Sequence, residues 1–330
     1  MTTTEQPTIA RPSPAEATAS EQEVEEFVDR FFGDLLGATN TYAATIGVSL
    51  GWYDALAGAA PLTSKELADR TDTDERYARE WLEQQTVAGT LQVLDAAAGP
   101  TQRRYTMTPA AAEVLTNRES LAYLAPFPGF LSHLGSSLDQ IVDVYRTGEG
   151  FGWHQHGDGA RCGQAEANRP IYVNLLAQEY LASIDDVHRA LTEGGRVADI
   201  GCGMGWSSIG VAKAYPNASV DGFDIDAPSI DKAAEYAAEA GVADRVAFHA
   251  GDVAEVQEGG YDLAMALECV HDLPDPVSVL SAMRSMVAPG GTVIFMDERV
   301  GEAFSADPGP VEHLLYGFSL LCCLPDGRNA

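Results

Sequence analysis

The C-terminal half of the chain alternates between short apolar runs and longer stretches of helix-forming residues. The apolar runs, each of strand length, occupy residues 197–200, 218–224, 245–249, 261–269 and 292–296. The segments between them that have the composition of helices are 207–214, 227–240 and 277–287. Strands that alternate with helices form a parallel sheet whose faces are covered by helices. We therefore predict an α/β fold with a Rossmann-like parallel sheet, in a domain that spans residues 186–330.

The N-terminal segment has helical periodicity instead. Residues 1–20 contain almost no side chains to bury, and we expect a disordered tail there. From Glu21 onward, apolar residues recur every three or four positions, as on one face of a helix. Residues 42–56 predict a second helix that is too apolar to be solvated on any face. We expect this second helix to pack in a core or in a dimer interface.

The next segment has the pattern of a winged helix. Thr63 begins a capping box at the start of one short helix, and Thr73 is expected to cap a second helix. Two apolar segments, 91–94 and 103–107, flank a Gly-Pro turn and predict a hairpin. Two helices followed by a hairpin resemble a winged helix, and we place this domain at residues 21–115.

Winged helices often bind DNA, but the charges here favour another role. The second helix is net acidic, with Asp74, Glu75, Glu80 and Glu83 against Arg76 and Arg79. Only Arg103 and Arg104 on the hairpin are suited to neutralising phosphates. We therefore expect a dimerisation module, with DNA binding as the alternative.

The composition is strongly acidic. The chain has 330 residues, with 20 Lys and Arg against 49 Asp and Glu, and a net charge of −29. Such a surface repels nucleic acid and anionic membranes, and it fits either a salt-adapted source or a genome poor in lysine codons. No run approaches the roughly 18 apolar residues of a membrane span, and the N-terminus lacks a signal-peptide layout. Five cysteines without metal spacing favour a reducing compartment, so we expect a cytoplasmic protein.

Residues 116–185 are predicted to form a helical linker between the two domains. This region contains a glycine-rich aromatic loop at 148–159 and a predicted long helix at 169–188. His154 and His156 lie in that loop, where the glycines do not favour a preformed metal cage. We therefore predict no metal site.

The strand–turn–helix at the start of the second domain contains the motif D-x-G-x-G-x-G, which comprises Asp199, Gly201, Gly203 and Gly205. Trp206 occupies the place of the last glycine in the dinucleotide fingerprint G-x-G-x-x-G, so that pattern fails. Downstream come Asp224 after the second strand, Asp252 after the third, and a Pro-Gly-Gly turn at 289–291. In this order the set resembles class I S-adenosylmethionine (SAM) methyltransferases. With a winged helix in front, the chain resembles bacterial winged-helix methyltransferases and plant-type O-methyltransferases.

The resemblance implies a set of residues at the SAM cofactor. These are Asp199, Gly201, Cys202, Gly203, Gly205, Asp224, Ile225, Gly251, Asp252, Val253 and Glu268. Asp199 is expected to orient the methionine ammonium, Asp224 to accept from the ribose hydroxyls and Asp252 to accept from the adenine amino group. Ile225 would pack on the adenine ring, and the Val253 amide would lie near a ring nitrogen.

The resemblance also implies that the linker at residues 116–185 folds over the cofactor site and lines the acceptor pocket, and we expect aromatic side chains there. The candidates are Phe127, Phe130, Phe151, Trp153 and Tyr172, and the alternative for each is an ordinary place in a core. His271 follows the fourth strand in V-H-D-L-P-D, which looks like the L-H-D-W-x-D segment of plant-type O-methyltransferases, whose histidine is the general base. Leu273 replaces the Trp of that segment, and Asp272 or Glu298 would have to orient the imidazole. The alternative is a structural histidine that caps a helix.

These features predict SAM-dependent methyl transfer to a hydroxyl group of a small molecule, by a homodimer that binds neither membrane nor nucleic acid. The family sheet has seven strands, and the last two are not found in this sequence. We therefore expect an exposed edge at the fifth strand, unless another segment or subunit covers it. Two alternatives stay open. One is a winged-helix transcription regulator that responds to SAM or a metabolite, and the other is a truncated, non-catalytic homologue.

Overall fold

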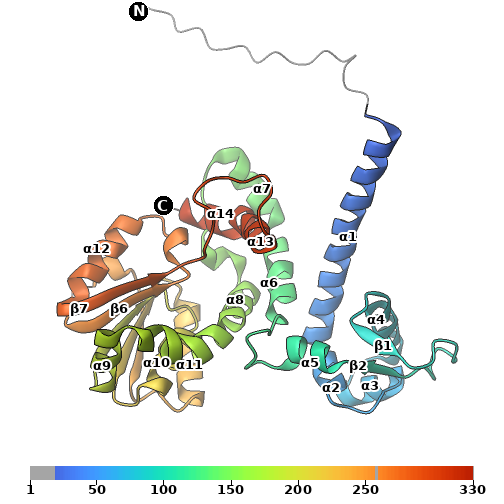
Figure 1. Cartoon of the computed structure of the whole chain (residues 1–330), viewed down its shortest axis with the longest axis horizontal. Coiled ribbons are helices and arrows are strands. Elements are labelled where there is room, and N and C mark those ends of the chain that lie inside the picture. Colours follow the sequence, from blue (N-terminus) through green and yellow to red (C-terminus); the bar gives the residue numbers. More distant parts are fainter. Residues whose placement is uncertain (1–18, 257–258, 330) are drawn as a thin grey trace, which may run out of the picture.

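The computed structural model describes residues 19–256 and 259–329, so the predicted tail at 1–20 lies almost wholly outside the described residues. Figure 1 shows a winged-helix domain at the foot of a long helix, and a separate part in which a sheet is covered by helices. Within the described ranges, no helix is long and apolar enough to cross a membrane.

The first helix, α1 (Glu21–Ser49), is longer than predicted. Ser20 and Glu23 form a capping box at its start. Gly51 adopts a left-handed φ of 66°, and α2 (Trp52–Leu56) begins immediately after it. The single helix predicted over 42–56 is therefore wrong, because this glycine allows the chain to turn between two helices.

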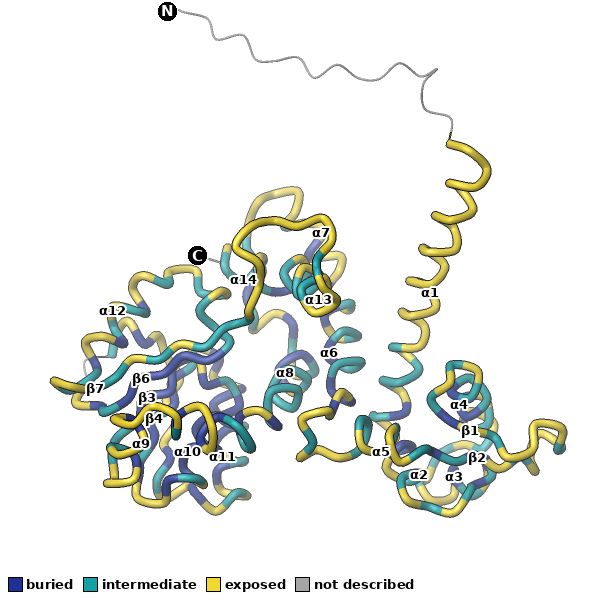
Figure 2. The backbone as a smooth tube through the Cα atoms, viewed as in Figure 1, coloured by how far each residue is buried: buried dark blue, intermediate teal, exposed yellow. Residues whose placement is uncertain are grey.

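Most of α1 projects away from the rest of the described chain and is coloured as exposed in Figure 2. Near its C-terminal end, Gly47 is buried against the ring of Trp81. The apolar periodicity predicts the helix correctly, but a partner for its apolar side is not found within the described part of the chain. The side chains concerned are about half exposed: Val24, Phe27, Val28, Phe31, Phe32, Leu35 and Leu36.

The winged helix is confirmed. It consists of α3 (Ser64–Thr71), α4 (Glu75–Val87), β1 (Leu91–Val93) and β2 (Tyr105–Met107), and α5 (Pro109–Thr116) follows. Asp74, rather than Thr73, caps α4 by accepting from the amides of Arg76 and Tyr77. The Thr73 hydroxyl instead accepts from the indole of Trp52, which packs with Trp81 in the core of this domain.

The linker region is helical, as predicted, but its boundaries differ. It contains α6 (Pro126–Gly135), α7 (Leu138–Thr147), a 3-10 helix (Trp153–His156) and α8 (Asp158–Ile171). A π-helical segment (Tyr172–Tyr180) and a 3-10 turn (Leu181–Ser183) then lead to α9 (Asp185–Thr192). The continuous helix predicted over 169–188 is therefore wrong.

Two glycines explain the misplaced start of α8. A Cβ atom on Gly159 would overlap the ring of His133, and one on Gly163 would lie 2.7 Å from the Cβ of Phe130. Both contacts are with α6. These glycines allow two helices to approach closely rather than forming a flexible loop.

The predicted parallel sheet is confirmed. Its strands are β3 (Arg196–Ile200), β4 (Ser219–Asp224), β5 (Val246–Ala250), β6 (Tyr261–Leu267) and β7 (Val287–Met296). They are all parallel, in the order β5-β4-β3-β6-β7. The helices between them are α10 (Trp206–Ala214), α11 (Ala227–Glu239) and α12 (Pro276–Met286). The strand order brings the carboxyl ends of β3, β4 and β6 together at one edge, where ligands bind in such sheets.

Strand β7 lies at the end of the described sheet, and Phe295 on it is 63% exposed. After β7 the chain continues into α13 (Pro310–Phe318), a π-helical segment (Ser319–Cys323) and α14 (Leu324–Gly327). Figure 1 places α13 and α14 beside the linker helices. There the amides of Phe151 and Trp153 donate to the Pro325 carbonyl and to Asp326 Oδ1. We call the assembly of residues 126–171 and 310–329 the cap.

Candidate functional site

The glycine turn between β3 and α10 has a left-handed backbone at all three motif glycines, with φ of 68° at Gly201, 51° at Gly203 and 80° at Gly205. A Cβ on Gly201 would lie 2.7 Å from Cys269 Sγ, and one on Gly205 would lie 2.6 Å from the Phe248 ring. At Gly203, no atom lies within 4 Å of the position that a Cβ atom would take. The outer glycines therefore allow close packing, and the middle one leaves its backbone accessible to a ligand.

Asp199 lies under this turn and is 1% exposed. Its Oδ2 accepts hydrogen bonds of 2.6 Å from the hydroxyls of Ser207 and Ser208 in the first turn of α10. Burial raises the pKa of Asp199 to about 6, although the serine hydrogen bonds favour the charged form. The carboxylate thus holds the glycine turn and α10 together, and its predicted role toward the methionine ammonium stays a prediction.

Asp224 at the end of β4 contacts the glycine turn directly. Its Oδ2 accepts from the Gly203 amide at 2.8 Å, and its Oδ1 accepts from the Asp226 amide at 2.9 Å. Burial raises the pKa of the Asp224 carboxyl, and the two amides oppose that shift. The next side chain, Ile225, is 74% exposed. An acceptor for hydroxyl groups and an exposed apolar side chain are therefore adjacent at this edge.

The end of β5 lies beside Asp224. The Gly251 amide donates to the Asp224 carbonyl at 2.9 Å, and Gly251 has a φ of 152°. Asp252 is exposed, and its Oδ1 accepts from the Ala254 amide, which caps a short 3-10 helix that begins at Val253. Cys202 is buried behind the glycine turn. The structure thus brings the residues predicted to bind the cofactor to one edge of the sheet.

Glu268 follows β6 and has a left-handed φ of 57°, which is uncommon for a residue with a side chain. Burial raises the pKa of Glu268 to about 8, and the neighbouring Glu298 carboxylate adds to this shift. Both effects favour the protonated form of Glu268. Backbone strain of this kind clusters at functional sites.

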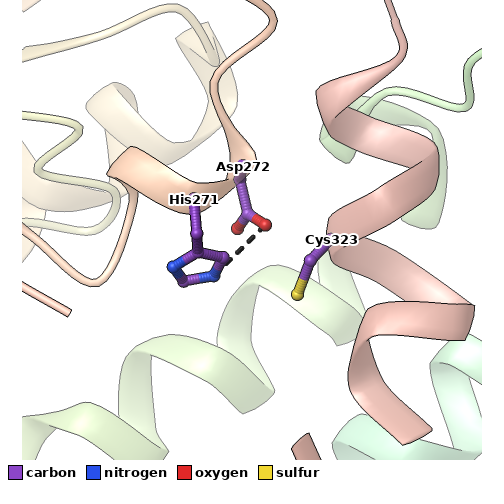
Figure 3. Close-up of side chains that lie close together, drawn as sticks. All are labelled: His271, Asp272 and Cys323. Atoms are coloured by element: carbon purple, nitrogen blue, oxygen red, sulfur yellow. Dashed lines mark ion pairs between the residues drawn. The ribbon is translucent and has the colours of Figure 1, made fainter. Parts of the chain in front are cut away.

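His271 lies three residues farther on, in a short 3-10 helix (Val270–Asp272). Its Nδ1 is hydrogen-bonded to Asp297 and lies 3.0 Å from Glu298 Oε2, and its Nε2 lies 3.2 Å from Asp272 Oδ1. Figure 3 shows His271 and Asp272 on one turn, with Cys323 facing them from the helical segment after α13.

Two of these partners, Asp297 and Cys323, were missed by reasoning from the sequence. Asp297 follows β7, and β7 pairs with β6. Residues that follow neighbouring parallel strands meet at one edge of the sheet. The strand order would therefore have indicated the contact between His271 and Asp297.

The carboxylates control the charge of the imidazole. Burial of His271 favours its neutral form, but the contacts with the Asp272 and Asp297 carboxylates outweigh burial and raise its pKa far above the ordinary value. The pKa of Glu298 is lowered to about 2, where burial opposes the shift and the hydrogen bond with His271 drives it. The neighbouring carboxylates therefore favour the protonated form of the His271 imidazole.

The same donors could also hold a metal ion. Side-chain donor atoms of His271, Asp272 and Cys323 lie within 4.8 Å of one another, as do those of His271, Asp297 and Glu298. Among the described residues these are ordinary hydrogen-bonding partners of an imidazole, and we assign no metal to them. The expectation that the protein binds no metal stays a prediction.

Four of the five predicted acceptor-pocket aromatics gather in the cap, where Phe130 and Phe151 are each 4% exposed, as in the alternative of an ordinary place in a core. Phe130 lies 6.3 Å from Trp153 and 5.4 Å from Phe318 between ring centroids, and Phe127 lies 6.4 Å from Phe318. Phe151 packs edge-on against His156 at 4.8 Å. We call these rings, Phe127, Phe130, Phe151, Trp153 and Phe318, the aromatic wall.

Tyr172 lies apart from that wall, in the main core of the sheet domain. Its hydroxyl is 3.5 Å from the carbonyl of Leu267, the last residue of β6. His156 is also buried, and burial lowers its pKa to about 4, whereas His154 is exposed. The two loop histidines therefore lie in different environments.

Comparison with known proteins agrees with this architecture. Residues 191–314 match the family model of a methyltransferase domain, and residues 38–117 match that of an Rv2258c-like winged HTH domain. The chain therefore combines a methyltransferase domain with an N-terminal winged HTH domain.

Curated relatives match only part of the chain. A ubiquinone biosynthesis O-methyltransferase of Ralstonia nicotianae is 38% identical over 129 residues, which is 38% of this chain and 51% of that protein. A probable chloroplastic tocopherol O-methyltransferase of Oryza sativa is 26% identical over 175 residues, 51% of this chain and 47% of that protein. The chain thus spans about half the length of the curated relatives it matches.

Solved structures resemble nearly the whole chain. Mitomycin 7-O-methyltransferase has a TM-score of 0.68 at 22% identity, covering 92% of this chain and 88% of that one. Human N-acetylserotonin methyltransferase in complex with SAM has a TM-score of 0.65 at 18% identity, with 93% and 88% covered. These likenesses show that the fold is that of class I methyltransferases.

Proposed function

We propose that this chain, whose second half is a methyltransferase domain, catalyses SAM-dependent methyl transfer to a hydroxyl group of a small molecule. The observation that carries the proposal is Asp224, which is held against the amide of Gly203 beside a glycine turn that leaves room for a ligand. This cradle fits SAM. When bound, SAM supplies an electrophilic methyl group on a positively charged sulfur.

The residues of the chain then have distinct tasks toward the cofactor. Asp224 accepts from the ribose hydroxyls, and the exposed Ile225 packs against the adenine ring. Asp252 accepts from the adenine amino group. The backbone at Gly201 and Gly203 would hold the methionine and ribose portions. Because methyl transfer is an in-line displacement, these contacts contribute mainly by fixing the position of the methyl group.

We assign the general base to His271. His271 in its neutral form would take the hydroxyl proton on an imidazole nitrogen as the acceptor oxygen takes the methyl group from the sulfur of SAM. Asp297 and Glu298 at Nδ1 orient the ring and stabilise the imidazolium that results. Because the resting pKa is raised, the neutral base is a minor form whose population grows with pH.

The aromatic wall of the cap favours a planar, apolar acceptor that carries a hydroxyl group, since stacked and edge-on ring contacts select flat rings. The exposed apolar face of α1 supports a homodimer through the N-terminal domain. A row of half-exposed Phe, Val and Leu side chains on one helix is costly in water and marks an interface.

The alternative of a DNA-binding regulator has less support, because all four candidate arginines are paired with glutamates of the same domain. Phosphate binding would have to break these pairs. They are Arg76 with Glu80 at 2.6 Å, Arg79 with Glu75 at 3.5 Å, Arg103 with Glu83 at 2.7 Å and Arg104 with Glu66 at 3.0 Å.

Calorimetric titration of the full chain with S-adenosylhomocysteine (SAH) tests the cofactor site. We expect saturable binding that falls at least about tenfold in Asp224→Ala, because a hydrogen bond to a charged group contributes about 1.5–3 kcal/mol. The matched control is Asp143→Ala, which removes an exposed carboxylate paired with Arg146. Absence of heat with protein shown folded by circular dichroism would favour the non-catalytic alternative.

Methyl transfer itself is tested with radiolabelled SAM and a panel of planar phenols. Label that reaches a phenol but not its O-methylated counterpart supports hydroxyl transfer. Binding of SAH without transfer to any member of the panel would contradict the planar-acceptor assignment and leave the cofactor site in place.

A further inference from the structure

A buried ion pair joins the cap to the cofactor edge. Arg161 on α8 pairs with Asp226, which follows β4, through Nε to Oδ2 at 2.6 Å and Nη2 to Oδ1 at 2.9 Å. The side chains are 7% and 3% exposed. The two residues are 65 positions apart in the sequence and belong to different parts of the fold.

On the cap side, the same guanidinium holds the aromatic loop. Its Nη1 donates to Asp158 Oδ1 at 2.7 Å, and its Nη2 donates to the carbonyl of His154 at 3.1 Å. These acceptors lie at the end of the loop that contains Trp153, one of the rings of the aromatic wall. Arg161 therefore fixes the loop through contacts that do not involve the acceptor pocket itself.

On the other side, Asp226 is hydrogen-bonded to Asp224, the carboxylate that we propose binds the cofactor. Its amide donates to Asp224 Oδ1, and Asp224 Oδ2 accepts from the amide of Gly203. The Asp226 carboxylate also caps α11 by accepting from the amide and hydroxyl of Ser229. An unbroken series of hydrogen bonds thus runs from the aromatic loop through Arg161 and Asp226 to the glycine turn.

The charges make this connection sensitive to the loss of one partner. Asp226 and Asp224 are two carboxylates on one short turn, and Arg161 is the cation that contacts the first of them. A buried ion pair adds little net stability compared with apolar packing, but removal of one partner leaves a buried charge without compensation. Without Arg161, the Asp226 carboxylate would repel the charge on Asp224 and release the turn.

Building on the proposed function, we propose that Arg161 is a positioning residue. It couples cofactor binding to how well the aromatic loop at residues 148–159 is ordered. Cofactor contact with Asp224 and Gly203 strengthens the turn that holds Asp226, and Asp226 in turn holds Arg161 and the loop. The aromatic wall is therefore most ordered when the cofactor is bound. This predicts that the cofactor binds before the acceptor.

The test uses the full chain and SAH as the probe. Amide hydrogen exchange is measured at residues 153–160 with and without SAH, together with SAH affinity by calorimetry. In the wild type we expect SAH to slow exchange in this loop at least about threefold. In Arg161→Gln we expect SAH affinity to fall at least about tenfold and the protection of the loop to disappear.

Two further variants separate coupling from general damage. Arg146→Gln removes an exposed arginine of the same cap, which is paired with Asp143, and should match the wild type. Adding Asp226→Asn to Arg161→Gln removes the uncompensated carboxylate while keeping an N-cap side chain. We expect the double variant to recover part of the SAH affinity but not the protection of the loop.

The outcomes are distinguishable from failure of the proposed function. If the wild type binds SAH and its loop exchange does not change, the coupling is refuted without any variant. The same holds if folded Arg161→Gln keeps wild-type affinity and protection. If the wild type does not bind SAH at all, the cofactor assignment itself fails, and the coupling falls with it.

Discussion

Charged side chains are arranged differently in the winged-helix domain and at the sheet edge formed by the carboxyl ends of β3, β4 and β6. In the first, Arg76, Arg79, Arg103 and Arg104 each lie within 3.5 Å of a glutamate in the same domain. At the second, the Asp224 carboxylate is held by backbone amides, and Glu268 faces another carboxylate, that of Glu298.

This difference indicates where the molecule interacts with other molecules. Pairs that are exposed to solvent neutralise each other and contribute little beyond solubility. Acidic groups that are buried close to one another are costly, and such an arrangement is typical of functional sites. SAM carries positive charge on its sulfur and on its ammonium group, so an acid-rich edge is suited to attract it.

The largest effect should come from the imidazole at the acid-rich edge. His271→Gln removes the proposed base while keeping a polar side chain. We expect methyl transfer at saturating SAM to fall about 10²–10⁴-fold, the range typical of a lost general base. SAH affinity should change by less than about twofold, because His271 has no assigned contact with the cofactor. Transfer that stays within about threefold of wild type would assign His271 a structural role.

A smaller effect should come from changing the charge around His271 without removing it. Carboxylates raise the pKa of the imidazole, so the neutral base is populated only as the pH rises. Asp272→Asn removes one carboxylate and should move the rising limb of kcat against pH to lower pH, by about one unit or more. The groups that face the imidazole are Asp272, Asp297, Glu298 and Cys323, with Glu268 beside Glu298.

The control for this pH profile is Asp143→Asn. This variant removes an exposed carboxylate of the cap, which is far in sequence from His271 and is paired with Arg146. We expect its pH profile to match that of the wild type. A profile of Asp272→Asn that moves to higher pH would contradict the assignment of His271 as the base.

Some parts of the structure could be predicted from the sequence and others could not. The parallel sheet, the winged helix and the glycine turn follow from local patterns, because alternation, capping and glycine spacing act over a few residues. The ends of the linker helices were misplaced because Gly159 and Gly163 serve helix packing. That use of glycine depends on α6, a separate element, and no local pattern indicates it.

The contacts within the candidate site were harder to predict for the same reason. The pairs of His271 with Asp297 and of Arg161 with Asp226 join residues that are 26 and 65 positions apart. Each pair depends on how strand ends and cap helices are placed in space. The residues implied by the family resemblance were brought to one edge, but their partners could be identified only from the fold.

The smallest effect should come from the paired arginines of the winged helix. Arg103→Gln breaks the contact with Glu83, whose side chain is 38% exposed, as against 27% for Arg103. We expect a loss of at most about 1 kcal/mol in the free energy of unfolding, because partly exposed pairs are screened by solvent. SAH affinity should not change, since this domain has no assigned contact with the cofactor.

Thermal unfolding of Arg103→Gln, Glu83→Gln and the double variant isolates the energy of the pair itself. A coupling near zero would agree with charges that serve only solubility. The opposite result would be DNA binding by the wild type that weakens with salt and is lost in Arg103→Gln. Such a loss would mean that Arg103 contacts a phosphate, a role that the ion pair with Glu83 does not explain. That result would make the winged helix, rather than the acid-rich edge, the site through which the protein acts.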